Sequence, residues 1–309
     1  MTLWIGIDVA KATLAVCVRP EGGHITLPNT PQGHAQMLAL MSDQPVGNIL
    51  MEATGGYERA LMAALKEAGR PVTRINPRRA RAFAIAMGTT AKTDPIDAAL
   101  LARMAELIQP PSVEWEPERN ALRDLVNRRQ QLIGERDSER RRLKQASSQI
   151  VRDDLSGHIG ELRRRIHAIS KAMIQAQRQL DSALCRRFEA IPGLGPVTAA
   201  SLMAYLPELG HLDRRQIAAL AGLAPYNVDS GQHAGKRRIR GGRAAIRRVL
   251  YMACWSVIRK QHDFKQRYER LRHSGKCAKV AITACMRILL VRLNAMVRDN
   301  TEWKIPITT

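Results

Sequence analysis

Aromatic side chains are scarce in this sequence of 309 residues, where Phe, Trp and Tyr together make 4%. That content is low for a protein that reads bases by stacking them on aromatic rings. The five cysteines are an odd number without C-x-x-C spacing, and the eight histidines are scattered. The sequence therefore predicts neither a disulfide framework nor a zinc site, and a reducing compartment fits its cysteines best.

Long apolar runs are missing as well. The most apolar late stretch, Val280–Val297, is interrupted by Arg287 and Arg292, so it does not read as a membrane-spanning helix. Asp8 and Lys11 occupy positions where a signal peptide needs its apolar region. We therefore expect a cytoplasmic protein without a membrane partner.

Acidic residues are outnumbered by basic ones, with 28 Asp and Glu against 49 Lys and Arg, a formal net charge of +21. Residues 1–110 carry a net charge of +2, residues 111–185 carry +4, and residues 186–309 carry +15. Arginine outnumbers lysine by 38 to 11, which favours bidentate phosphate contacts over diffuse attraction. This excess predicts a nucleic-acid partner, contacted mainly through the C-terminal third.

Residues 1–110, the first of three predicted domains, alternate strand and helix signals. Trp4–Ile7 and Leu14–Val18 are short apolar runs that predict a hairpin, and Ile49–Met51 predicts a buried strand. Helical patterns alternate with the later strands as far as Ile108. Hairpin strands followed by alternating strands and helices predict an α/β sheet with at least one parallel part.

Residues 111–187 are predicted to form a helical hairpin. Apolar residues at spacings of four and three, typical of a coiled-coil seam, are Leu155, Ile159, Leu162, Ile166, Ile169, Met173, Ala176, Leu180 and Ala183. A weaker upstream seam comprises Leu122, Leu125, Leu132, Leu143 and Ile150. Asp153–Gly157 carries residues that break and cap helices, so we expect the hairpin to turn there. Such a hairpin spaces domains or joins subunits.

Residues 188–309 form the basic domain. Gly193 and Gly195 lie between helical patterns, where a glycine-rich hairpin lets backbone N–H groups approach a phosphate. This element resembles the helix-hairpin-helix of DNA-binding proteins, and a tight helix–helix turn is an equally good interpretation. Further candidates for nucleic-acid binding are Lys236, Arg237, Arg238, Arg240, Arg243, Arg247 and Arg248.

Four carboxylates are candidates for a metal site. Asp8 and Glu52 follow predicted strands, while Asp94 and Asp97 lie three apart at a helix start and hence on one face. In a ribonuclease H-like sheet the four would converge, as two Mg²⁺ ions about 3.5–4 Å apart require. A structural interpretation competes with this one: Asp94 as helix N-cap before Pro95, with Asp97 reaching back to it. The two interpretations are compatible.

Several motifs occur in order along nearly the whole chain. They are Gly6–Lys11, Glu52–Tyr57, Lys92–Ala98, Ile191–Gly195, Leu220–Pro225, Ser230-Gly231, and Gly241–Arg243 with Arg247 and Leu250. Together these motifs resemble the blocks of the DEDD transposases of the insertion-sequence 110 family. The resemblance implies a ribonuclease H-like, Holliday-junction-resolvase-like fold for the first domain, a coiled coil next, and a mostly α-helical transposase domain at the end.

The resemblance also implies roles for individual residues. Asp8, Glu52, Asp94 and Asp97 would be Mg²⁺ ligands, and Ser230 would be the nucleophile that cuts DNA. Members of the family recombine a donor with a target DNA under the guidance of a noncoding bridge RNA. They assemble as oligomers, here a dimer or tetramer, in which the carboxylate domain of one subunit meets the serine domain of another. Such a protein would be associated with the bacterial nucleoid when it acts.

The residues around Ser230 carry a weaker signal by themselves. Asp-Ser-Gly is first of all a turn sequence, and His233 reads better as a solvated loop histidine than as a base. The basic residues that follow Ser230 are suited to holding a scissile phosphate. Three functions stay open: an RNA-guided recombinase with a serine–DNA intermediate, a metal-dependent junction nuclease that uses water, and a non-enzymatic architectural protein.

Overall fold

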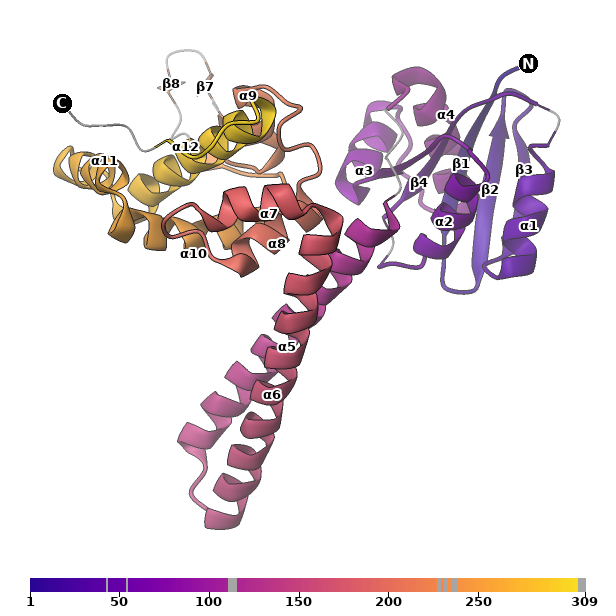
Figure 1. Ribbon diagram of the computed structural model, residues 1–309. Coiled ribbons are helices and arrows are strands. Elements are labelled where there is room, and N and C mark those ends of the chain that lie inside the picture. The colour runs from indigo at the N-terminus through magenta and orange to yellow at the C-terminus, as the bar shows by residue number, and fades with distance from the viewer. Residues whose placement is uncertain are drawn as a thin grey trace. The chain divides into compact units, whose positions relative to one another are not determined.

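The structure is a computed structural model that divides into two compact units, Met1–Trp115 and Glu116–Thr309 (Figure 1). It describes residues 1–42, 44–53, 55–110, 116–226, 229–230, 233–234 and 238–304. Each unit has its own hydrophobic core, and each is described separately below.

The N-terminal unit is built on a five-stranded mixed sheet. Its strands are β1 (Leu3–Val9), β2 (Thr13–Arg19), β3 (Gly23–Pro28), β4 (Val46–Glu52) and β5 (Val72–Ile75). They lie in the order β3-β2-β1-β4-β5. The first three strands pair antiparallel, and β4 pairs parallel with both β1 and β5. The predicted hairpin, followed by a parallel part, is confirmed.

Helices cover both faces of this sheet. They are α1 (Pro31–Ala39), α2 (Arg59–Glu67), α3 (Pro77–Ala86) and α4 (Asp94–Ile108). Because side chains alternate along a strand, Ile5 and Ile7 of β1 enter a core shared with α1 and α2. The opposite face, which includes Leu50 of β4, packs against α4 and α3.

The C-terminal unit begins with two long helices, α5 (Pro117–Gln145) and α6 (Gln149–Leu180), which lie side by side and antiparallel (Figure 1). The residues that meet between them include Leu132 of α5 and Leu162 and Ile166 of α6, all buried. The helical hairpin and the downstream apolar stripe were therefore predicted correctly as far as Met173.

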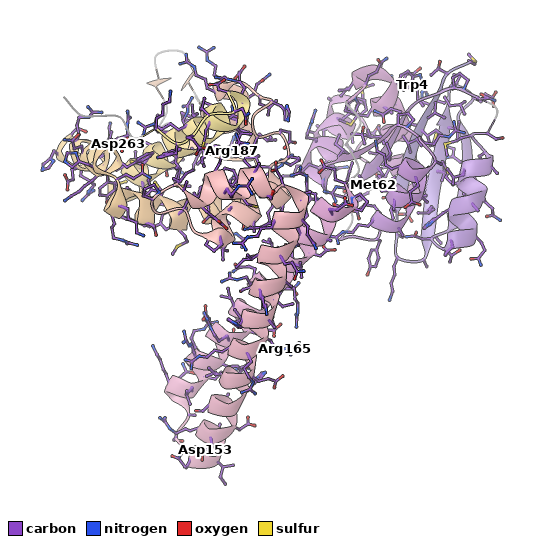
Figure 2. The ribbon with its side chains drawn as sticks, viewed as in Figure 1. Trp4, Met62, Asp153, Arg165, Arg187 and Asp263 are labelled. Carbon is purple, nitrogen blue, oxygen red and sulfur yellow. The ribbon has the colours of Figure 1, made fainter. Side chains whose placement is uncertain are left out.

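The position of the turn was predicted wrongly. The chain reverses at residues 146–148, and Asp153 lies inside α6 near the tip of the pair (Figure 2). The Ser156 hydroxyl donates to the carbonyl of Arg152 at 2.7 Å, and the Gln149 amide donates to Asp153 at 2.8 Å, so these polar side chains bond within the helix. Ile150 is 82% exposed and belongs to no seam.

The remaining helices are α7 (Ser182–Glu189), α8 (Pro196–Tyr205), α9 (Arg214–Leu220), α10 (Ala244–Lys260), α11 (His262–His273) and α12 (Ala278–Arg298). The apolar stripe was predicted to continue to Ala183, but it is interrupted because α6 ends at Leu180. Asp181 is the N-cap of α7, and its side chain accepts a hydrogen bond from the Leu184 N–H. By length and composition alone, α12 is apolar enough to cross a membrane. Half of that stretch is buried inside the unit, as in the core helix of a globular protein.

Candidate acidic site and basic segment

Two candidate carboxylates follow neighbouring parallel strands. Gly6 of β1 lies opposite Leu50 of β4, and Ile7 lies opposite Met51. The next residues along the two strands are Asp8 and Glu52, at the same carboxyl-terminal edge. Side chains alternate, so Asp8 lies on the same face as Gly6, and Glu52 on the same face as Leu50. Both carboxylates therefore occupy the face covered by α4.

The helix α4 brings the other two carboxylates to this edge. A Cβ atom on Gly6 would come within 2.1 Å of the Ala98 carbonyl oxygen and 2.2 Å of the Ala102 nitrogen. Only glycine leaves room for such a close approach of helix and strand. The helix thus crosses β1 directly beside Asp8, and its first turn carries Asp94 and Asp97.

The structure corrects the capping interpretation of these two aspartates. The N-cap of α4 is Thr93, Asp94 is already helical, and no side chain makes a capping hydrogen bond there. The Asp97 backbone N–H donates to the Thr93 carbonyl, which is an ordinary helical bond. Neither Asp94 nor Asp97 uses its carboxylate to cap α4. The positive N-terminal end of the helix dipole nevertheless stabilises the negative charge of both side chains.

Electrostatics link the four side chains. Burial, and after it the charges of Asp94, Asp97 and Glu52 in that order, together raise the pKa of Asp8 from 3.8 to about 6. Burial also raises the pKa of Glu52 and of Asp97, while the nearby ammonium of Lys92 opposes both shifts. Mutual repulsion of this kind occurs when carboxylates share one site.

The donor chemistry of this acidic cluster (Asp8, Glu52, Asp94 and Asp97) fits Mg²⁺. The ion prefers oxygen ligands, keeps several waters, and is commonly bound through one or two carboxylates together with substrate phosphates. Among the residues that the structure describes, no three His, Cys, Asp or Glu side chains are grouped closely enough to hold a metal ion by themselves.

Basic residues beside the cluster were missed by the sequence analysis. Arg78 and Arg81 of α3, together with Lys92, line a hollow that Glu52 and Asp97 also line. The available signal was the run Arg78-Arg79-Ala80-Arg81 in an otherwise nearly neutral domain. Sequence spacing could not show that these cations face the carboxylates.

The segment around Ser230 forms short antiparallel pairs. Strand β6 (Pro225–Tyr226) pairs with β9 (Arg238–Ile239), and β7 (Asp229–Ser230) pairs with β8 (His233–Ala234). The backbone of Ser230 lies opposite that of His233. The side chains of both residues, and the whole of Lys236 and Arg237, lie outside what the structure describes.

Two of the candidate nucleic-acid-binding arginines make contacts inside the protein. Arg243 forms a two-pronged ion pair with Glu208, at 2.5 Å for each arm, and donates to the Tyr205 carbonyl at 2.8 Å. Arg247 donates to backbone carbonyls at Ala221 and Gly241. These bonds hold the start of α10 against the rest of the unit. Exposed candidates are Arg238, Arg240 and Arg248.

The hairpin between α7 and α8 is packed more tightly than a free phosphate loop. Gly193 has φ of +96°, and a Cβ there would come within 2.8 Å of the α10 backbone at Ser256 and Val257. The Gln261 side chain donates to the Pro192 carbonyl at 2.7 Å. Gly195, which precedes α8, is exposed and faces open space. The structural turn thus accounts for Gly193, and Gly195 is the part of the loop open to a ligand.

Comparison with known proteins covers most of the chain. One family profile, described as a transposase, matches residues 5–152, and a second, described as transposase IS116/IS110/IS902 family, matches residues 185–269. A pilin gene-inverting protein of Moraxella lacunata is 27% identical over 96% of this chain and 96% of its own. The transposase for insertion sequence element IS1111A of Coxiella burnetii is 25% identical over 74% of this chain and 70% of its own.

A further relative is the uncharacterized 43.6 kDa protein of insertion element IS110 from Streptomyces coelicolor. It is 29% identical over 47% of this chain and 35% of its own length. The first profile extends through α5 to the start of α6, the second begins after α6, and together they include the acidic cluster and the segment around Ser230. The chain therefore belongs to the IS110 family of transposases, which are DNA-cutting recombinases.

Proposed function

We propose that this transposase cuts and rejoins DNA through a serine–DNA intermediate, at a metal-assisted site formed by the acidic cluster, under the direction of a guide RNA. The observation that carries the proposal is the convergence of Asp8, Glu52, Asp94 and Asp97 at one sheet edge, with their charges coupled. The strand order and the helix across β1 support a ribonuclease H-like, Holliday-junction-resolvase-like domain. In such a domain carboxylates serve phosphoryl transfer.

The residues proposed to hold Mg²⁺ are Asp8, Glu52, Asp94 and Asp97, with two ions per site. Bound there, the metal would neutralise charge on the scissile phosphate and orient its oxygens. The chain itself supplies these oxygen donors, and burial of Asp8 and Glu52 together with the mutual repulsion of the carboxylates favours a cation that neutralises their charge. Lys92 adds a positive charge beside the same phosphate position.

Ser230 is the proposed nucleophile. Its Oγ would form a bond to phosphorus while one backbone P–O bond of the DNA breaks. The hydroxyl proton departs, and the leaving DNA oxygen takes up a proton. The reverse reaction with a new DNA end restores the serine and needs no ATP. A neutral serine needs activation by a base or a metal. The segment around Ser230 would therefore have to reach an acidic cluster, either that of its own chain or that of another subunit.

The net charge of +15 in residues 186–309 supports DNA and RNA as partners of the C-terminal unit. The helices α5 and α6 are proposed to form a coiled coil that joins subunits as a dimer or tetramer. A metal-dependent nuclease that uses water as nucleophile would need only the acidic cluster, and an architectural protein would need no carboxylate at all.

The test of this proposal compares Ser230→Ala and Asp8→Asn with the unchanged protein on DNA carrying the element's ends. Reactions are stopped in detergent, and we expect DNA that migrates with protein until protease is added. Both variants should lose this adduct. The controls are Ser274→Ala and Asp153→Asn, which change exposed residues away from the candidate sites, and they should retain it.

Each other outcome points to a different function. Metal-dependent cleavage by Ser230→Ala, without any adduct, would replace the recombinase with the nuclease. Full activity of Asp8→Asn in excess chelator would reject the metal site. RNA guidance is tested separately by sequencing RNA that co-purifies with the full chain. Recovery of random cellular RNA, instead of one transcript encoded beside the gene, would refute the guide.

A further inference from the structure

A hollow of about 460 Å³ lies between α3 and α4 in the N-terminal unit. Its walls combine three kinds of side chain: cations, carboxylates and apolar groups. Among the lining residues are Arg78, Arg81, Lys92, Glu52, Asp97 and Phe83. Its volume falls within the range of about 300–1,000 Å³ that is usual for pockets that bind small molecules.

We propose that this hollow binds one unpaired nucleotide of the DNA strand that is cut, with its phosphate on the cations and its base on the apolar floor. The inference rests on the proposed function, because it places this nucleotide next to the phosphate at the acidic cluster. It adds a binding site, made by α3 and α4, that positions the strand for cleavage.

The cations are placed to bind a phosphate. Arg78 and Arg81 are exposed and lie three residues apart, hence on one face of α3. In the part of the chain that the structure describes, neither they nor Lys92 form an ion pair within 4.0 Å. One arm of Arg81 donates to the Thr90 carbonyl at 3.4 Å, which leaves most of its donors for a ligand. These three cations outnumber the two carboxylates of the wall, Glu52 and Asp97, so the charge of the hollow favours an anion on its α3 side.

The floor of the hollow is apolar. Leu101 and Met104 of α4 are each 2% exposed and belong to a core that Phe83 of α3 borders. Phe83 is partly exposed, so part of its surface remains open to a ligand. An aromatic ring beside aliphatic side chains suits a base, since base–aromatic stacking contributes about 1–3 kcal/mol and tolerates any sequence. A free inorganic anion would gain no binding energy from this apolar floor.

The position of the hollow selects a single strand. Glu52 and Asp97 belong both to its wall and to the acidic cluster, so its occupant lies directly against the proposed cleavage site. A base in duplex DNA is stacked and paired, and it reaches a pocket between α3 and α4 only when it is flipped out of the duplex. An unpaired nucleotide enters without that cost. Such nucleotides arise where DNA strands are opened for exchange.

The experiment uses the full chain in excess chelator, so that no cleavage is needed for a result. Mixed-sequence single-stranded DNA containing 5-iodouracil is crosslinked by light, and the modified peptides are mapped by mass spectrometry. We expect crosslinks within Pro77–Met104, at Phe83 or Met104. The double variant Arg78→Gln with Arg81→Gln should reduce these crosslinks about fivefold or more. It changes only exposed side chains, so the fold should persist.

Arg79→Gln is the matched control, because Arg79 lies between the two on the same helix, is exposed, and does not line the hollow. It should leave the crosslinks unchanged. Equal losses in control and double variant, or crosslinks only outside Pro77–Met104, would overturn the proposal. Stronger crosslinking of RNA than of DNA would also overturn it in favour of the guide as occupant. The crosslinking experiment measures binding and not cleavage. Its result therefore stands even if Ser230 proves to form no adduct with DNA.

Discussion

Replacing Gly6 by alanine tests the contact that assembles the acidic cluster. The new Cβ would meet backbone atoms of α4, at 2.1 Å from the Ala98 carbonyl oxygen and 2.8 Å from the Leu101 carbonyl carbon. Ordinary van der Waals contacts of a Cβ begin at 3.4 Å. Backbone cannot rotate away as a flexible side chain can. The helix would therefore have to retreat from β1 by more than about 1 Å.

Two effects of different size follow from this displacement. Overpacking of a core costs about 1–3 kcal/mol, and the contacts here are with backbone, so we expect a loss near 3 kcal/mol in the N-terminal unit. The first turn of α4 carries Asp94 and Asp97, so both move relative to Asp8. A misplacement of about 1 Å at a catalytic site lowers rates on the order of a hundredfold. Activity should thus fall further than the population of folded protein explains.

Hydrogen exchange followed by mass spectrometry measures the first effect locally, in peptides covering β1 and α4, and DNA cleavage measures the second. Gly23→Ala is the matched control, since Gly23 begins β3 of the same sheet and its added Cβ would meet nothing within 4 Å. Gly6→Ala with exchange rates and cleavage equal to those of Gly23→Ala would refute the assignment of α4 to this close contact.

Three further outcomes are expected. The pKa of Asp8 is raised from 3.8 to about 6 in the folded protein, so without metal the N-terminal unit should lose stability as pH rises from about 4 through 6. Asp8→Asn should reduce this loss by about 1 kcal/mol after solvent screening, in denaturant titrations with chelator, while the raised pKa values of Glu52 and Asp97 maintain the rest; parallel pH profiles would contradict it. Arg243→Lys should lower the free energy of unfolding of the C-terminal unit by about 1–2 kcal/mol, because lysine cannot make the two-pronged pair with Glu208; an unchanged melting curve would contradict it. Arg129→Met should raise the melting temperature, because burial penalises the charged guanidinium and lowers its pKa. Ser170, which accepts from Arg129, would still donate to the Ile166 carbonyl. A lower melting temperature would show that the charge of Arg129 stabilises the packing of α5 on α6.

Local patterns predicted much of the secondary structure. The β1–β2 hairpin, the buried strand that ends at Glu52, and the long apolar stripe of α6 all follow from alternation or from spacings of three and four. The turn of the helical pair was misplaced because Asp153 and Ser156 suit helix ends but make their hydrogen bonds inside a helix. A short polar side chain does not determine by itself whether it caps a helix or lies within one.

Residue type and order along the chain determined the family and predicted the four carboxylates as a metal site, because both depend on motifs that can be read without coordinates. The tertiary structure alone decided what surrounds them. Gly6 is informative only once α4 is seen to lie against it, and only the structure shows that Arg78 and Arg81 line the same hollow as Asp97. The structure likewise assigned Arg243 to Glu208, some 35 residues away. Contacts between distant segments arise from the packing of whole helices and strands, and no short stretch of sequence contains that information.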